Sequence, residues 1–262
     1  MTYPKDEAAI RAVIQEKLEE IEQKQHVKIL YAVESGSRAW HLASPDSDYD
    51  VRFIYIRPRD AYLKLEPVKD FIDWELNEVL DINGWDITKA LRHFHKSNAT
   101  LFEWCHSPII YHTTEEWKLV QNTVQPYFSC KASMYHYYGT AHKNYHTYLL
   151  DEKVNYKKYF YVLRPLLACQ WINQRKCPPP VPFEQLADTL LDDELHQMVE
   201  KLLLLKMQMP ESAQGQRLDQ LNQYIAAELK RLQGVISTSK EERLTDWQAL
   251  DELFLTLLAK MS

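Results

Sequence analysis

Three aspartates fall within five residues of the stretch PDSDYD, and Asp48 and Asp50 are separated by a single residue. The run from Tyr49 to Ile56 is rich in branched and aromatic residues, which predicts a β-strand. Side chains two apart on a strand point to the same face, which puts these two carboxylates about 7 Å apart. Two such carboxylates repel each other unless a cation lies between them. Hard oxygen ligands of this kind suit Mg²⁺ or Mn²⁺.

A small-residue turn precedes this pair. Gly36 and Ser37 follow a second β-prone run, residues 27–33, and open a predicted short helix. Backbone N–H groups and a hydroxyl at such a turn can hold phosphate. Phosphate binding beside a two-carboxylate metal site is what phosphoryl or nucleotidyl transfer requires. The alternative interpretation is a solvated acidic turn that is capped by Asp46 and Ser47.

Gly36-Ser37, a ten-residue spacer and Asp48-Tyr49-Asp50-Val51 resemble the signature of the DNA polymerase β-like nucleotidyltransferase superfamily. Longer stretches resemble one family within it, the nucleotidyltransferases that are associated in some genomes with RNA ligase and RNA repair. These stretches are ESGSRAWHLASPDSDYDVRFIYIRP, LDINGWDITKAL, KSNATLFEWCHSPIIY, VNYKKYFYVLRPLLACQWI and PPPVPFEQL. The resemblance covers most of the chain, roughly residues 30 to 190.

The resemblance implies a role for each residue of the motif. Asp48 and Asp50 would hold two divalent ions, one on the triphosphate of an incoming NTP and one that lowers the pKa of the attacking hydroxyl. Gly36 and Ser37 would hold the β- and γ-phosphates. Arg38 is a further candidate for a phosphate contact, with an exposed surface arginine as the alternative.

The superfamily also uses a third carboxylate on a neighbouring strand, which often activates the attacking hydroxyl and holds the catalytic metal. Asp81 lies inside the strand-like run EVLDIN, where an unpaired buried carboxylate would be costly, so a metal would explain it. Asp86 fits a metal site and the N-cap of a helix equally well. Asp73 and Glu75, on the preceding predicted strand, are further alternatives. We predict Asp81, with Asp86 as the first alternative.

A helix in the second half of the chain carries basic and aromatic side chains at spacings of three and four residues. In KYFYVLRPLLACQW these are Lys157, Lys158, Tyr161 and Arg164. Such spacing can place side chains on one helix face. The two interpretations are a triphosphate or base contact that reaches over a cleft, and a solvated helix edge with core tyrosines.

The elements that position these residues follow from hydrophobic patterning. Residues 6–25 predict an amphipathic helix, and KDFIDWEL and EVLDIN predict two further strands with Asn77 near the turn between them. From Thr113 onward the sequence predicts helices almost throughout. We therefore expect an α+β fold. A nucleotidyltransferase-type mixed sheet with flanking helices would occupy residues 1–110, and a helical domain that closes the cleft would occupy residues 111–262.

Composition restricts the classes of function. The formal net charge of −6 is unlike that of a general nucleic-acid-binding protein, so any polynucleotide contact should be a local patch. No apolar run approaches the roughly 20 residues of a membrane span, and the N-terminal stretch has no apolar signal core. The four cysteines form no CxxC pair and are expected to be reduced. We expect a cytoplasmic protein with no membrane partner, and the oligomeric state stays open.

The expected activity is transfer of a nucleoside monophosphate from an NTP, such as ATP, to a hydroxyl group with release of pyrophosphate. It would use two Mg²⁺ or Mn²⁺ ions. The family's association with RNA repair implies an RNA end as the acceptor, but AMPylation of a protein or modification of a small molecule uses the same core. A catalytically silent nucleotide-binding module is the other hypothesis, and the complete set of motif residues argues against it.

Overall fold

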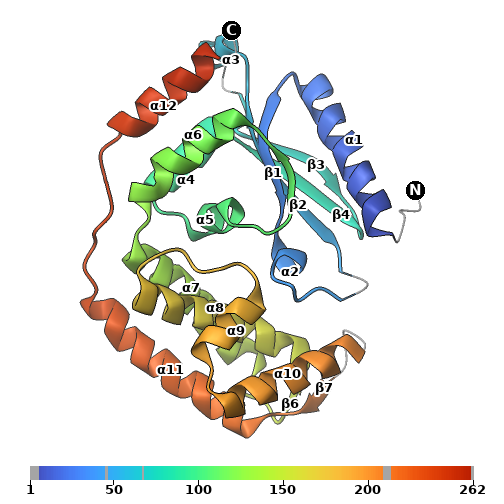
Figure 1. Cartoon of the computed structure of the whole chain (residues 1–262), viewed down its shortest axis with the longest axis vertical. Coiled ribbons are helices and arrows are strands. Elements are labelled where there is room, and N and C mark those ends of the chain that lie inside the picture. Colours follow the sequence, from blue (N-terminus) through green and yellow to red (C-terminus); the bar gives the residue numbers. More distant parts are fainter. Residues whose placement is uncertain (1–5, 45–46, 67, 209–213, 261–262) are drawn as a thin grey trace. The chain divides into compact units, whose positions relative to one another are not determined.

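The computed structural model describes residues 6–44, 47–66, 68–208 and 214–260 (Figure 1). Asp46, one of the three clustered aspartates, lies outside the described residues. The chain divides into two compact units. The first unit comprises residues 1–40, 46–127 and 243–262, and the second comprises residues 41–45 and 128–242.

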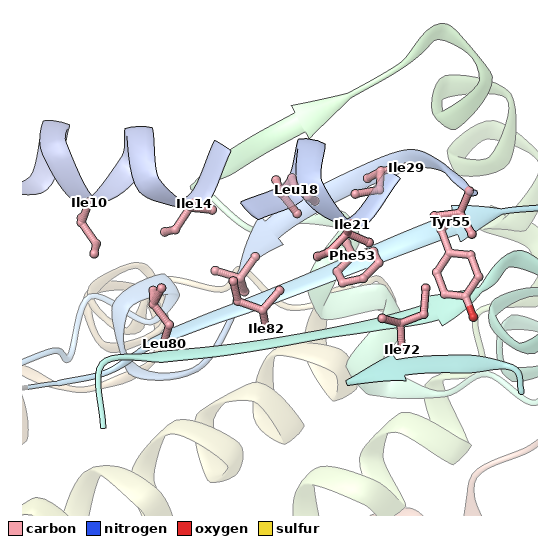
Figure 2. Close-up of a cluster of buried hydrophobic side chains, with 13 residues drawn as sticks. Ile10, Ile14, Leu18, Ile21, Ile29, Phe53, Tyr55, Ile72, Leu80 and Ile82 are labelled. Carbon is pink, nitrogen blue, oxygen red and sulfur yellow. The ribbon is translucent and has the colours of Figure 1, made fainter. Parts of the chain in front are cut away.

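The first unit begins with helix α1 (Glu7–Gln25). Asp6 caps it by accepting a hydrogen bond from the Ala9 N–H, and His26 ends it in the left-handed conformation. The predicted amphipathic helix is therefore confirmed. Its apolar stripe is buried and faces the strands in Figure 2, where the labelled residues of the helix are Ile10, Ile14, Leu18 and Ile21.

The first unit contains a mixed five-stranded sheet with strand order β3-β4-β2-β1-β5. The strands are β1 (Lys28–Glu34), β2 (Tyr49–Ile56), β3 (Phe71–Leu76), β4 (Leu80–Asp86) and β5 (Ile110–Thr113). Strands β2 and β4 pair in parallel, and the other pairs are antiparallel. The predicted strands are confirmed, whereas the short edge strand β5 was not predicted. The amide oxygen of Asn77 accepts bonds from the Val79 and Leu80 N–H groups in the β3–β4 turn.

Helices cover both faces of this sheet. Helix α1 covers one face, where alternate strand residues such as Phe53, Tyr55, Leu80 and Ile82 complete a buried cluster (Figure 2). On the other side lie α4 (Ile87–His95), α5 (Ala99–Cys105) and α6 (Glu115–Val124) (Figure 1). Helix α12 (Gln248–Ala259) packs against α6 and α4. The short helices α2 (Gly36–Ala39) and α3 (Arg59–Tyr62) follow β1 and β2.

The second unit is mainly helical. Its helices are α7 (Cys130–Tyr148), α8 (Tyr156–Arg175), α9 (Phe183–Leu190), α10 (Asp193–Gln208) and α11 (Asp219–Thr238). Helix α8 is buried on most sides and packs against α7, α9 and α11. A two-stranded ladder of β6 (Lys153–Asn155) and β7 (Gln214–Gln216) was not predicted. The expected α+β fold is confirmed.

Two further findings bear on the predicted environment of the chain. All four cysteines are free thiols. Among the described residues, no helix combines the length and the apolar character that a membrane span needs.

Candidate functional site

The structure brings two predicted carboxylates together on neighbouring strands. In the parallel pairing of β2 with β4, Asp50 lies opposite Asp81. Residues in register on adjacent strands lie about 4.8 Å apart, with their side chains on the same face. The Arg52 Nη2 group donates hydrogen bonds to Asp50 Oδ1 (2.9 Å) and to Asp81 Oδ2 (2.6 Å). One guanidinium therefore bridges both carboxylates.

Strand alternation explains the position of Arg52. It lies two residues after Asp50, so both side chains share a face, while Val51 and Phe53 point into the core beneath α1. The Arg52 Nη1 group also donates to the backbone carbonyls of Val51 (3.1 Å) and Asp81 (2.8 Å). The side chain is only 17% exposed. Arg52 was not predicted from the sequence, although it lies two residues from Asp50 and therefore on the same face of the strand.

Asp48 is exposed and precedes the first residue of β2. The loop that carries it is fixed by Arg38, whose Nε donates to the Asp48 carbonyl (3.1 Å) and whose Nη2 donates to the Ser47 carbonyl (2.7 Å). The same guanidinium lies 3.6 Å from the centre of the Tyr49 ring, a cation–π distance. Arg38 therefore connects α2 to the loop before β2 through two hydrogen bonds.

The Gly36 turn lies directly against the carboxylate of Asp50. Gly36 has φ +61°, a conformation that strongly favours glycine, and a Cβ at this position would lie 2.0 Å from Asp50 Oδ2. The Ser35 N–H also donates to the Asp50 carbonyl (2.8 Å). Ser37 follows in α2. The close approach needs a residue without a side chain, and it places the backbone of the predicted phosphate-binding turn beside the predicted metal ligand.

A buried glutamate supports this arrangement from β1. Glu34 is 1% exposed, and its carboxylate accepts hydrogen bonds from the Asp50 N–H (2.8 Å) and the Tyr111 hydroxyl (2.6 Å). Burial raises the pKa of Glu34 to about 7. Glu34 was not predicted from the sequence, because a single glutamate at the end of a strand forms no distinctive pattern. Its contacts fix the backbone at Asp50.

We expect the raised pKa of Glu34 to make folding stability fall as the pH rises from about 4.5 to 7. Below this range both states hold the proton. Within it the unfolded chain releases the proton while the folded chain retains it, so unfolding becomes easier by on the order of 3 kcal/mol. Glu34→Gln removes the titration. In metal-free urea unfolding at several pH values, the variant should therefore gain stability relative to the wild type as the pH increases.

The matched control for this measurement is Glu115→Gln, which removes an exposed carboxylate from α6. The difference in the free energy of unfolding between Glu115→Gln and the wild type should not increase with pH in the way expected for Glu34→Gln. The raised pKa of Glu34 would be contradicted if the difference in the free energy of unfolding between Glu34→Gln and the wild type stayed constant from about pH 4.5 to 8.

Asp86 is the N-cap of α4. This was one of the two roles that the sequence allowed for it, the other being a metal ligand. Its carboxylate accepts hydrogen bonds from the Thr88 N–H (2.9 Å), the Thr88 hydroxyl (2.7 Å) and the Tyr62 hydroxyl (3.0 Å). It is buried, and this burial raises its pKa. Asp86 lies five residues beyond Asp81 on β4, which corresponds to about 16 Å along a strand and to the opposite face. The Asp86 position is thus separate from the Asp50–Asp81 pair.

The remaining alternatives on β3 are engaged elsewhere. The carboxylate of Asp73 accepts a hydrogen bond from the Asn83 side chain. The carboxylate of Glu75 forms an ion pair with Lys17 of α1 (3.3 Å). Among the predicted third carboxylates, Asp81 is the one that lies in register with Asp50.

The predicted basic residues of the second half all lie on α8, in the second unit. Lys158 Nζ lies 4.5 Å and 4.8 Å from the ring centres of Tyr148 and Tyr161. Arg164 is buried, and its Nε and Nη2 groups donate to the Val181 carbonyl at 3.3 Å. Lys157 is half-buried near the start of the helix. The structure thus keeps Lys158 beside aromatic rings and turns Arg164 toward the interior of its unit.

The chemistry of the donor set fits a hard divalent cation. Asp50 and Asp81 present adjacent carboxylate oxygens, Asp48 lies two residues before Asp50, and such ligands suit Mg²⁺ or Mn²⁺. Across the described ranges, however, no group of three or more His, Cys, Asp or Glu side chains is arranged as a metal site. The Arg52 guanidinium holds two of the carboxylates instead.

The chain is similar to several known proteins. Residues 10–256 match the model of the RNA repair pathway DNA polymerase beta family. The chain is 40% identical to the uncharacterized protein YcgL of Bacillus subtilis (strain 168) over 251 residues. This alignment covers 94% of this chain and 95% of YcgL. A solved nucleotidyltransferase-like protein from Exiguobacterium sibiricum 255-15 aligns with 93% of this chain and 80% of its own, at 15% identity and a TM-score of 0.30.

Proposed function

The chain belongs to the RNA repair pathway DNA polymerase beta family, and on this premise we propose that it transfers a nucleoside monophosphate from an NTP to a hydroxyl group. Pyrophosphate is the second product. The observation that carries the proposal is the Asp50–Asp81 pair, in register on parallel strands, with the Gly36 backbone against Asp50. A phosphate group held by this turn would lie beside carboxylates of the kind that bind metal ions.

Asp48, Asp50 and Asp81 are the residues that would hold two Mg²⁺ or Mn²⁺ ions. Bound there, the ions would neutralise the triphosphate and lower the pKa of the attacking hydroxyl. In this proposal Gly36 and Ser37 bind the β- and γ-phosphates, and Asp81 accepts the proton of the acceptor hydroxyl.

Several other residues have supporting roles. Glu34 fixes the backbone of Asp50, and Arg38 fixes the loop that carries Asp48. Lys157 and Lys158 are proposed nucleotide contacts, whereas the buried Arg164, which donates to the Val181 carbonyl, is poorly placed for that role.

The proposed acceptor is an RNA end, because the family is named for an RNA repair pathway. A protein hydroxyl is the alternative acceptor. A second candidate function, a catalytically silent nucleotide-binding module, is favoured by one specific observation: Arg52 occupies oxygens of both Asp50 and Asp81. The two functions differ in whether a covalent product forms.

Incubation with each labelled NTP, Mg²⁺ or Mn²⁺ and a pool of RNA tests the proposal. We expect the wild type to label RNA with at least one NTP. We expect Asp48→Ala/Asp50→Ala to lose about a thousandfold or more in rate, because the proposed metal ligands supply several kcal/mol of transition-state stabilisation. Asp251→Ala, which removes an exposed carboxylate from α12, is the control and should keep wild-type activity.

Parallel reactions with candidate proteins in place of RNA distinguish the acceptors. Label on protein but not on RNA would replace the RNA acceptor with a protein hydroxyl. If no NTP gives a labelled product, or if the double variant labels as fast as the wild type, catalysis at this site is refuted.

A further inference from the structure

A cavity of about 430 Å³ lies at the other end of the strands from the Asp50–Asp81 pair. It is lined by Arg57, which follows β2, by Asp86, which ends β4, and by residues of α3, the loop after it and α4. Arg57 lies seven residues beyond Asp50, which corresponds to about 23 Å of extended strand. The volume falls within the range of small-molecule sites, about 300–1,000 Å³. This cavity is therefore separate from the proposed catalytic site.

Cationic groups outnumber anionic groups in its lining. The cations are Arg57, Lys64, Lys69 and Arg92, and the carboxylates are Glu66, Asp70 and Asp86. Two of these carboxylates already have partners. Asp70 pairs with Lys89 of α4 (3.2 Å), which adds a further cation, and Asp86 accepts from Thr88 and Tyr62. Counted with Lys89, five cationic groups stand against three carboxylates around the cavity, so the net charge of this region is positive.

Arg57 is the buried member of this set, and its hydrogen-bonding capacity is poorly used. Its side chain is 14% exposed. Its Nε is fully buried and finds no hydrogen-bond partner in the described part of the chain, and it lies 3.8 Å from Asp86 Oδ2. Its Nη2 bonds to the Tyr55 hydroxyl and the Lys69 carbonyl are both long, at 3.4 Å. Because a guanidinium carries five donors, several remain to be satisfied.

An unsatisfied buried donor is costly, so a native structure that retains one calls for a physical explanation. The buried Nε faces Asp86 and is out of reach of the cavity, but the Nη2 group makes only two long bonds. The oxygens of an anionic ligand in the cavity would accept from the Nη groups of Arg57, while Arg92 and the lysines neutralise its charge. Arginine pairs geometrically with phosphate through two parallel bonds. Phe71 and Tyr62 also line the cavity, and Lys69 and Lys89 lie 5.8 Å and 5.0 Å from the centre of the Phe71 ring.

We propose that this cavity is a second binding site, which binds a phosphate monoester through Arg57 and Arg92. The phosphate belongs either to a free mononucleotide or to the 5′ end of an RNA strand. The proposal goes beyond the nucleotidyltransferase reaction and does not depend on it, since none of the lining residues belongs to the Asp48–Asp50–Asp81 set.

Calorimetry in EDTA, with Asp48→Ala/Asp50→Ala as the parent protein, tests the proposal without interference from the catalytic site. The probes are AMP, a 5′-phosphorylated hexaribonucleotide and the same strand with a 5′-hydroxyl. We expect at least one phosphorylated probe to bind and the 5′-hydroxyl strand not to bind. Arg92→Gln and Arg57→Gln should each weaken binding about tenfold, which is the usual contribution of one charge-assisted contact.

Arg59→Gln is the matched control, because Arg59 is an exposed arginine two residues from Arg57 that does not line the cavity. The affinity of Arg59→Gln for the phosphorylated probes should stay within about twofold of the affinity of the parent protein. Arg92 is also exposed, so Arg92→Gln reports on binding even if Arg57→Gln fails to fold.

Binding of AMP alone would identify a mononucleotide site, and preference for the phosphorylated strand would identify a strand-end site. Three results would each overturn the proposal: no binding of any probe at millimolar concentration, equal binding of the 5′-hydroxyl strand, or an equal loss in Arg59→Gln.

Discussion

Asparagine in place of Asp81 is expected to slow nucleotidyl transfer by about a thousandfold or more while the melting temperature changes by only a few degrees. The substitution keeps an oxygen that can accept from Arg52 Nη2, so the local structure survives. It removes a negative charge that the proposed reaction needs, both as a ligand for a divalent cation and as a proton acceptor. A loss of about 4 kcal/mol in transition-state stabilisation corresponds to that factor. The measurements are single-turnover labelling and thermal unfolding.

The matched variant is Asp86→Asn, which makes the same chemical change five residues further along β4. Asparagine is as good an N-cap as aspartate, so the bonds with Thr88 can persist. Arg57 loses its nearby negative charge, but burial already disfavours that charge and raises the pKa of Asp86, so we expect the free energy of unfolding to change by no more than about 1 kcal/mol. Transfer activity should stay within about tenfold of the wild type. If instead Asp86→Asn abolishes transfer and Asp81→Asn does not, the third carboxylate is Asp86.

Local features of β2 and β4 were predictable from the sequence, whereas the pairing of the two strands was not. The bounds of the strand Tyr49–Ile56 and the N-cap at Asp86 were predicted correctly, because alternation and capping are local properties. The adjacency of Asp50 and Asp81 depends on β2 pairing with β4 in parallel, although β3 lies between them in the chain. No local pattern specifies this register.

Elements that were not predicted share the same physical cause. The paired strands β6 and β7 have three residues each and lie about sixty residues apart, so neither shows an alternation of its own. On α8 the spacing left two interpretations open, a basic and aromatic face that contacts a nucleotide and a solvated helix edge with core tyrosines. The helix is buried on most sides, and Arg164 bonds with the Val181 carbonyl in the interior. Which side chain turns inward depends on a segment that follows the helix, and spacing within the helix does not contain that information.

Glutamine in place of Arg52 is expected to destabilise the metal-free protein and to increase its stabilisation by Mg²⁺. Without the guanidinium, the carboxylates of Asp50 and Asp81 face each other on neighbouring strands with no cation between them. Burial already raises the pKa of Asp50, and the Arg52 charge opposes that effect. Removing one partner from a largely buried ion pair costs about 3–5 kcal/mol, so thermal unfolding in EDTA should occur roughly 10 °C lower.

The effect of Mg²⁺ distinguishes a competing cation from a merely structural arginine. Arg52 donates to the same carboxylate oxygens that a bridging divalent ion would use, so its removal should leave them available. We expect millimolar Mg²⁺ to raise the melting temperature of Arg52→Gln by several degrees more than that of the wild type, because a ligand stabilises only the state that binds it. In the control Asp50→Asn/Arg52→Gln, this additional shift should disappear. Equal Mg²⁺ shifts in wild type and Arg52→Gln would show that the guanidinium and the ion do not share a site, and would weaken the assignment of Asp50 and Asp81 as metal ligands.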